Sequence, residues 1–261
     1  MKKEYQRFAD SDLFEGIVSL RVLIANMEKA DADGSSSRRI ETVYYDEERA
    51  VKEQKEFFWL RHRAEVLGFS VSLCKRDVID EMTVGNTHGG IAAQCAPYAL
   101  QALDDFQIPE NGFFVLLDGI EDPYNFGYAL RSLYAAGADG VLLPERNWMS
   151  AAGVVCRASA GASELLRLYV GDSLDAISLL KGKGYRVACA DLRESVSLYD
   201  ADLRLPILLV VGGEKRGISA AVLKTADLRI RIDYARDFGA SLSAASAATV
   251  AGYEIFRQNR K

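Results

Sequence analysis

The sequence predicts an α/β protein built from two domains. Its 261 residues are enough for two domains with sizeable cores. From residue 113 onward, apolar strand-length runs alternate with helical patterns, which is typical of a parallel sheet flanked by helices. The first hundred residues contain a shorter series of both kinds. We therefore expect a small α/β domain over residues 1–98, a linker over 99–112 and a larger parallel-sheet domain over 113–261.

The composition is that of an ordinary globular protein, with 49% apolar and 26% charged residues. No segment approaches the roughly 20 apolar residues of a membrane span, and the polar N-terminus has no signal-peptide core. These features predict a cytoplasmic protein without a membrane segment. The net charge of −5 argues against a protein that coats nucleic acid, so any such contact must come from local basic patches.

Residues that commonly bind metals or act as nucleophiles are scattered. The cysteines lie far apart and form no CxxC pair, which predicts lone buried thiols: Cys74, Cys95, Cys156 and Cys189. The two histidines, His62 and His88, are too distant in sequence to indicate a site. We expect no metal site, and no Ser/His/Asp or Cys/His arrangement is visible.

In the N-terminal part, periodicity predicts three helices and three strands. The helices are expected at 13–27, 48–67 and 78–82, and the strands at 40–45, 69–73 and 91–93. Basic residues on a loop and on one helix are candidates for nucleic-acid contact, or else simply solvated charges: Arg38, Arg39, Arg61, His62 and Arg63.

The C-terminal part opens with a continuous apolar run at 113–117, as expected for a parallel strand buried on both faces. Residues 118–125 supply turn chemistry, including Asn125 as a helix N-cap. From Phe126 the apolar period is helical, with Leu130 and Leu133 on the same stripe. Arg131 falls on a different face, near the carboxyl end of a strand, where open α/β sheets place their ligands.

The remaining elements continue the alternation. Strands are expected at 165–170, 185–190, 207–211 and 228–232, and helices at 174–180, 219–225 and 244–258. A Gly212-Gly213-Glu214 turn follows a buried strand, where glycine lets the backbone approach a ligand closely. No G-x-G-x-x-G follows the first strand, which disfavours a dinucleotide-dependent oxidoreductase.

Three ordered segments carry a resemblance. The first is Asp122-Pro123-Tyr124-Asn125-Phe126-Gly127 with Arg131, and the second is residues 208–219, LLVVGGEKRGIS. The third is residues 230–232 with Ser241-Leu242-Ser243. In this order they resemble the three motifs of the SpoU/TrmH family of RNA ribose 2′-O-methyltransferases in the SPOUT superfamily. Residues 157–162, RASAGA, are similar to a connecting segment of that family. Residues 87–93, THGGIAA, resemble the closing strand of a ribosomal-protein-like substrate-binding domain.

The resemblance implies a trefoil knot in the parallel-sheet domain, a homodimer, and S-adenosylmethionine as cofactor. It implies methylation of a ribose 2′-hydroxyl in structured RNA, ribosomal RNA ahead of transfer RNA. By position, the implied catalytic residues are Arg131, Asn125, Glu214 and Ser241, and the implied cofactor-binding residues are Gly212, Gly213, Ile232, Leu242 and Ser243. Glu214 would either hold the motif loops in place, which we favour, or sit near the sulfonium charge.

The resemblance implies that Arg131 is the general base, but the cost of deprotonating an arginine leaves its role open. Deprotonating a guanidinium of pKa ~13.8 at pH 7 costs about 9 kcal/mol. Arg131 is therefore either a base whose neighbours relieve that cost or a clamp on a nucleotide phosphate. A surface ion pair is the third alternative.

Two positions depart from the family pattern. Ser243 stands where asparagine is usual, and Asp233 stands where proline is common. Serine keeps the ability to cap a helix but loses the second donor of an amide. The alternative function is therefore a non-catalytic RNA- or cofactor-binding relative.

Overall fold

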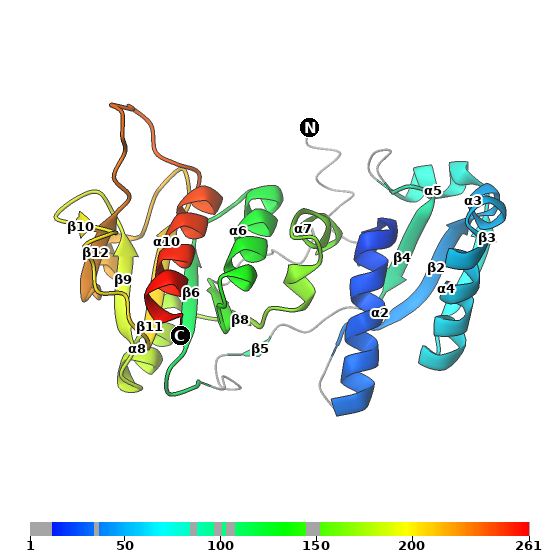
Figure 1. The fold of residues 1–261 in the computed structure, drawn as a ribbon, viewed down its shortest axis with the longest axis horizontal. Coiled ribbons are helices and arrows are strands. Elements are labelled where there is room, and N and C mark those ends of the chain that lie inside the picture. The colour runs from blue at the N-terminus through cyan, green and yellow to red at the C-terminus, as the bar shows by residue number, and fades with distance from the viewer. Residues whose placement is uncertain are drawn as a thin grey trace. The chain divides into compact units, whose positions relative to one another are not determined.

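The computed structural model describes residues 12–33, 37–83, 88–96, 101–102, 108–144 and 152–260 (Figure 1). Two compact units are present. The first comprises 1–99 together with 147–165, and the second 100–146 together with 166–261. The described part of this segment, 152–165, thus packs with the N-terminal unit although in sequence it lies between two stretches of the C-terminal one. The sequence did not predict that assignment.

The first unit is a four-stranded mixed sheet with helices, in the strand order β1-β4-β2-β3. Its strands are β1 (Leu13–Glu15), β2 (Ile40–Asp46), β3 (Ser70–Cys74) and β4 (Ile91–Cys95), and its helices are α2 (Gly16–Asp33), α3 (Glu47–Lys52), α4 (Gln54–Leu67) and α5 (Arg76–Met82). The helix expected at 13–27 was wrong at its start, because residues 13–15 pair with β4. The helix expected at 48–67 is interrupted at Glu53. Thr87, part of the closing-strand segment, lies outside the described residues.

Segment 152–165 contributes α7 (Ala152–Ala158) and the 3₁₀ turn η3 (Ala162–Glu164). Both glycines of this segment make close approaches that a side chain would prevent. A Cβ at Gly153 would lie 2.0 Å from the Leu13 carbonyl oxygen, and one at Gly161 would lie 2.4 Å from a Val22 methyl. Arg157 also forms a 2.5 Å ion pair with Glu15. The segment is therefore an integral part of the first unit.

The basic candidates of this unit separate into buried and exposed groups. Arg38 is buried and pairs with Asp12 at 2.7 Å and with Glu164 at 3.1 Å. Its guanidinium also lies 4.8 Å from the centre of the Phe14 ring. Arg38 is thus a structural cation rather than an RNA contact. Arg61 and His62 are exposed on α4.

The second unit is an all-parallel sheet of eight strands in the order β10-β12-β9-β11-β6-β7-β8-β5. The strands are β5 (Gln101–Ala102), β6 (Phe113–Asp118), β7 (Gly140–Leu143), β8 (Leu168–Val170), β9 (Arg186–Ala190), β10 (Val196–Ser197), β11 (Ile207–Gly212) and β12 (Leu228–Arg231). The expected α/β class with a parallel C-terminal sheet is confirmed. Strands β5 and β10 were not expected, and each has only two residues.

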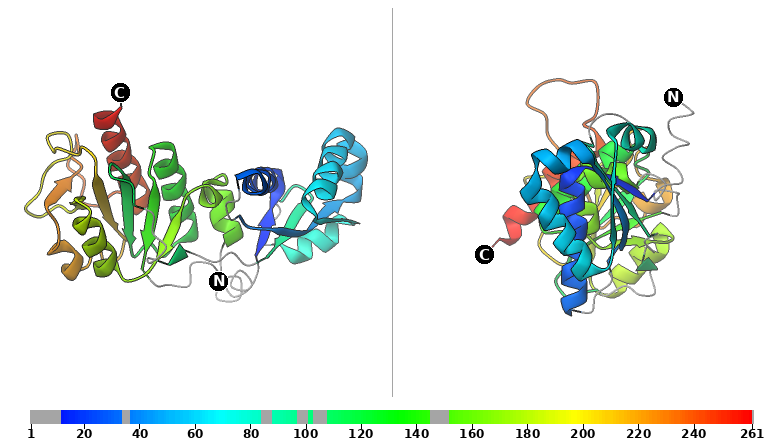
Figure 2. Two further views of the ribbon diagram at one scale, coloured as in Figure 1. Left: turned by 90° about the horizontal axis from the view of Figure 1, so that it is seen from below. Right: turned by 90° about the vertical axis from the view of Figure 1, so that its right-hand side faces the viewer.

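Helices cover both faces of this sheet, as the left view of Figure 2 shows. Helices α6 (Pro123–Ala135) and α10 (Ala244–Asn259) lie side by side on one face. Helices α8 (Ser173–Gly182) and α9 (Ala220–Leu223) pack on the other through Ile177, Leu180 and Val222. Gly252 brings α10 close to α6, because a Cβ there would lie 3.3 Å from a Leu133 methyl. The small residues of α10 therefore permit the close helix approach that the sequence suggests.

Strand order determines which loops meet. The chain runs from β6 outward to β8 and then returns to place β9 and β11 on the other side of β6. The crevice at such a reversal, at the carboxyl ends of the strands, is where open α/β sheets bind ligands. The trefoil knot implied by the family stays a prediction.

The contrast between Arg38 and its neighbour gives a stability test. Replacing Arg38 with methionine leaves Glu164, whose side chain is 9% exposed, without its ionic partner, and breaking a buried pair costs about 3 kcal/mol. Arg39 pairs with Asp31, but both side chains are more than 40% exposed, so Arg39→Met should cost under about 1 kcal/mol. Urea unfolding followed by circular dichroism measures both. Equal losses would contradict the structural role of Arg38.

Candidate active site

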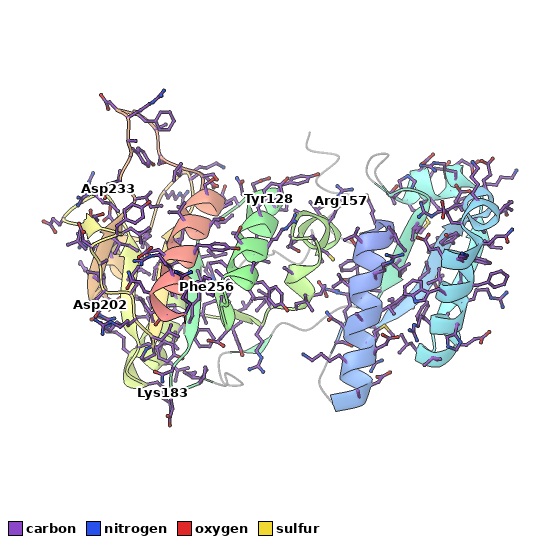
Figure 3. The ribbon with its side chains drawn as sticks, in the orientation of Figure 1. Tyr128, Arg157, Lys183, Asp202, Asp233 and Phe256 are labelled. Carbon is purple, nitrogen blue, oxygen red and sulfur yellow. The ribbon has the colours of Figure 1, made fainter. Side chains whose placement is uncertain are left out.

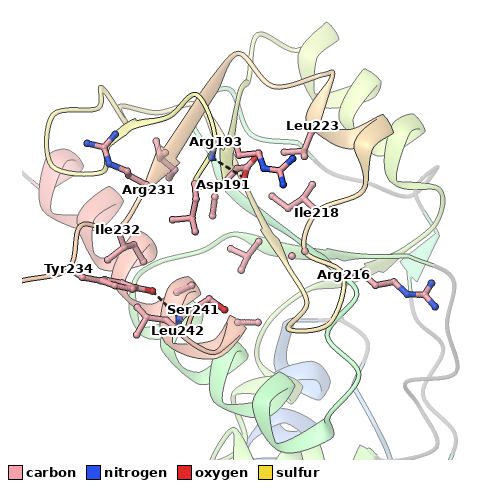
Figure 4. A pocket seen from close by; sticks show the side chains of 18 residues that line it. Asp191, Arg193, Arg216, Ile218, Leu223, Arg231, Ile232, Tyr234, Ser241 and Leu242 are labelled. Carbon is pink, nitrogen blue, oxygen red and sulfur yellow. Dashed lines mark hydrogen bonds between the residues drawn. The ribbon is translucent and has the colours of Figure 1, made fainter. Parts of the chain in front are cut away.

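A pocket of about 460 Å³ lies at the carboxyl ends of β9, β11 and β12 (Figure 4). Its size is within the 300–1,000 Å³ usual for small-molecule sites. Four of the site residues implied by the resemblance line it, namely Gly212, Ile232, Ser241 and Leu242. These residues come from three separate segments, and the fold brings them to one cavity. The walls are largely apolar, with Ile218, Leu223 and Ile230 completing them.

Glu214 links the loops that border the pocket. One carboxylate oxygen, Oε1, accepts a hydrogen bond from the Asn125 side-chain amide at 3.0 Å and another from the Ala244 backbone N–H at 3.3 Å. The three motif segments are thereby joined through a single atom. This geometry matches the loop-holding role that we favour for Glu214.

Asn125 is not the N-cap of α6. The cap is Asp122, whose carboxylate accepts the Asn125 backbone N–H at 2.8 Å, and Pro123 occupies the first helical turn. Proline suits that turn because its missing N–H would have no intrahelical partner. The helix therefore begins three residues earlier than expected, which releases the Asn125 amide to bond Glu214.

The segment just before the first motif is in direct backbone contact with the second motif. A Cβ at Gly213 would lie 2.0 Å from the Gly119 carbonyl oxygen. The Gly213 N–H donates to the Asp118 carbonyl at 2.9 Å, and the Asp118 carboxylate accepts the Ser219 N–H at 3.0 Å. Gly213 does not line the pocket but sets the distance between the loops after β6 and β11.

Ser243 caps α10, as its residue type permits. Its hydroxyl accepts the Ser246 N–H at 3.2 Å. The neighbouring Leu242 N–H donates to the Tyr234 hydroxyl at 3.0 Å, so Tyr234 holds the third motif loop against the pocket (Figure 4). Asp233, in place of the usual proline, accepts hydrogen bonds from Ser197 and Arg231. The Ser197 hydroxyl and Arg231 hold the pKa of Asp233 below its usual range.

Arg131 lies outside the pocket lining. Its side chain is exposed on α6, on the face opposite the buried Phe126, Leu130 and Leu133 stripe, as expected. No ion-pair or hydrogen-bond partner for it occurs among the described residues. The surface ion pair considered for Arg131 is therefore not found in that part of the chain.

Comparison with known proteins identifies the family to which this chain belongs. The model of the SpoU rRNA methylase family matches residues 112–253. The chain belongs to the SpoU rRNA methylase family. A second model, for RNA 2′-O ribose methyltransferase substrate binding, matches residues 34–101.

Two relatives and one solved structure illustrate the likeness. A protein of Staphylococcus saprophyticus assigned to the TrmH family of tRNA/rRNA methyltransferases is 33% identical over 66% of this chain and 71% of its own length. One of Bacillus subtilis is 31% identical over 73% and 78%. The AdoMet-bound rRNA methyltransferase of Sinorhizobium meliloti shares the fold, with a TM-score of 0.75 and 22% identity over 98% of this chain and 90% of that one.

One wall of the pocket lies outside the three motif segments. Asp191, Leu192 and Arg193, just after β9, line it. The β9 segment carries no SpoU motif, and only the position of β9 beside β11 brings it to the site. An acidic residue directly after an expected strand, at the carboxyl edge of the sheet, was the signal available in the sequence.

The thiols take no part in this site. All four cysteines are free, and three are buried. Burial raises the pKa of Cys189, which lies on β9, to about 12. Within the described residues, no three His, Cys, Asp or Glu side chains are grouped to hold a metal ion. Nor does any described helix have the length and apolar character of a membrane span.

Gly213→Ala tests the contact between the first two motif loops. The added methyl would overlap the Gly119 carbonyl, and overpacking of this kind costs about 1–3 kcal/mol. The melting temperature should fall by several degrees. Gly182→Ala is the control, because a Cβ there has no neighbour within 4 Å and alanine favours the helix. A Gly213→Ala variant as stable as the wild type would contradict the tight approach.

Proposed function

We propose that this SpoU methylase transfers a methyl group from S-adenosylmethionine to a ribose 2′-hydroxyl in structured RNA, ribosomal ahead of transfer RNA. The observation that carries the proposal is the convergence of Gly212, Ile232 and Leu242 on one pocket. The AdoMet-bound state of the related fold supports the choice of cofactor. The match of residues 34–101 to a substrate-binding model for 2′-O ribose methyltransferases supports the choice of hydroxyl.

The pocket residues suit this cofactor. Ile218, Ile232 and Leu242 offer apolar surface for an adenine ring. Gly212 leaves room for close backbone approach, because a Cβ there would lie 2.3 Å from the Gly217 carbonyl carbon. The Asp191 carboxylate offers an acceptor for hydroxyl or ammonium groups. When bound, the cofactor supplies an activated methyl group on a good leaving group.

The protein then has to align the 2′-hydroxyl with that methyl group, exclude water and receive or pass on a proton. Glu214 and Asn125 act as positioning residues that hold the loops around the site. The Ser241 side chain lines the pocket and can hydrogen-bond the substrate or cofactor. Arg131 contacts the nucleotide, either as the base or as a phosphate clamp.

A second copy of the chain would explain why Arg131 stands outside the pocket. The outward sides of α6 and α10 carry large exposed aromatics, including Tyr128 at 51%, Tyr253 at 46% and Phe256 at 45% (Figure 3). Arg131 lies on the same exposed side of α6. We propose that this surface pairs with itself in a homodimer and that Arg131 serves the partner's pocket. Light scattering should give twice the 28.7 kDa chain mass.

Calorimetry and methyl transfer test the function. S-adenosylmethionine should bind at about one site per chain and stabilise the fold. Labelled methyl groups should enter RNA from cells that lack the gene, and should be recovered in alkali-stable dinucleotides because a methylated 2′-oxygen cannot attack its phosphate. Separating ribosomal from transfer RNA decides the substrate. Cofactor binding without transfer into either pool would favour the non-catalytic alternative.

Arg131 variants separate its two roles. If Arg131 grips phosphate, Arg131→Lys keeps the cation and should retain much of kcat with a higher KM. If Arg131 takes the proton or orients the hydroxyl, kcat should fall about 10²- to 10⁴-fold with cofactor affinity unchanged. Arg131→Ala should abolish turnover in both cases without unfolding the protein, since the side chain is exposed. Wild-type turnover in Arg131→Ala would remove it from the mechanism.

A further inference from the structure

The loop between β12 and α10 projects from the second unit, as seen in Figure 1 and in the right view of Figure 2. Two aromatic side chains on it are exposed, Phe238 at 59% and Tyr234 at 39%. Their ring centres are 6.1 Å apart with a tilt of 58°. Exposing large aromatic side chains to water is unfavourable, which indicates that a ligand or partner covers them in the functional complex.

This loop is anchored to the pocket. The Tyr234 ring lines the cavity, and its hydroxyl accepts the Leu242 N–H. At the base of the loop, Asp233 bonds Ser197 and Arg231. Phe238 is not part of the lining, so it stands beside the pocket rather than within it. A group stacked on Phe238 would therefore be a neighbour of whatever fills the pocket.

Three arginines line the pocket or lie on this loop. Arg193 and Arg216 line the pocket, and Arg236 lies two residues before Phe238. All three are exposed, and their guanidinium groups have no ion-pair or hydrogen-bond partner within the described part of the chain. Aromatic rings interleaved with unpaired arginines are the combination that binds single-stranded nucleic acid, with stacking for bases and cations for phosphates.

We propose that Phe238, supported by Tyr234, is a stacking platform for an unpaired base of the RNA, next to the nucleotide whose ribose is methylated. The inference rests on the proposed function for its choice of RNA. A cofactor lid fits Phe238 less well, because Phe238 does not line the pocket. A second protein copy also fits less well, because the exposed aromatics of α6 and α10 already offer a surface for that contact and the loop carries the unpaired Arg236.

The test compares Phe238→Ala with Phe238→Trp, and with Tyr199→Ala as a matched control. Tyr199 is also an exposed aromatic of this unit, at 57%, and does not line the pocket. Binding of a fluorescein-labelled oligouridylate 12-mer is measured by anisotropy. Loss of one stacked base should weaken it roughly 5- to 150-fold in Phe238→Ala. Phe238→Trp and Tyr199→Ala should bind like the wild type.

Three further measurements on the same variants distinguish a stacking platform from a cofactor lid and from a protein interface. KM for RNA should rise in Phe238→Ala, while S-adenosylmethionine affinity and molecular mass stay unchanged. If the wild type is active and Phe238→Ala binds RNA as well as the wild type does, the stacking proposal is wrong and the proposed methyltransferase function is unaffected. A change in mass or in cofactor affinity without weaker RNA binding would reassign the loop to a protein interface or to the pocket. If the wild type transfers no methyl group but Phe238→Ala still binds RNA more weakly, the function fails and the platform stands.

Discussion

One carboxylate oxygen connects the parts of the polypeptide that must meet at the pocket. Glu214 Oε1 accepts hydrogen bonds from Asn125 on α6 and from Ala244 at the start of α10. These residues are 89 and 30 positions away from Glu214 in the chain. Because Glu214 is exposed, neither bond is strong by itself. Their effect depends on the packing that brings the three segments close together. Gly252 permits the close approach of α10 to α6, and Gly213 permits the close approach of the loop after β11 to the loop after β6.

That arrangement explains how short motifs that are far apart in the sequence meet at one site. Parallel strands deliver all their carboxyl ends to one edge, and the pocket lies at that edge, beside β9, β11 and β12. The loops after β9, β11 and β12 then form the pocket, while Tyr234 holds the third motif in place. The serine at 243 retains the helix cap that the α10 N-terminus requires. The departure from asparagine therefore removes an amide from the site without loosening the helix start.

Local patterns in the sequence predicted much of this fold. The apolar stripe of α6 correctly separated Leu130 and Leu133 from Arg131, because helix periodicity and burial agree there. Asn125 was misassigned because two residues of capping type lie three positions apart, and the Asp122-Pro123 pair forms the better start. Arg38 and Arg39 look identical in sequence, yet one is buried between two carboxylates and the other is exposed. The tertiary contacts of Arg38 with Asp12 and Glu164 distinguish them. For the same reason the Asp191 wall escaped prediction, since strand order decides that β9 neighbours β11.

The most direct test of the central claim is the S-adenosylmethionine affinity of Glu214→Gln and Glu214→Ala, measured by calorimetry. A carboxylate that acts by joining loops can be replaced by glutamine, whose carbonyl oxygen accepts the same N–H groups. The account predicts near wild-type affinity for Glu214→Gln and a loss of roughly tenfold for Glu214→Ala, as expected for hydrogen bonds to a charged group. Equal losses in both variants would show that the negative charge itself is required and would contradict the loop-joining account.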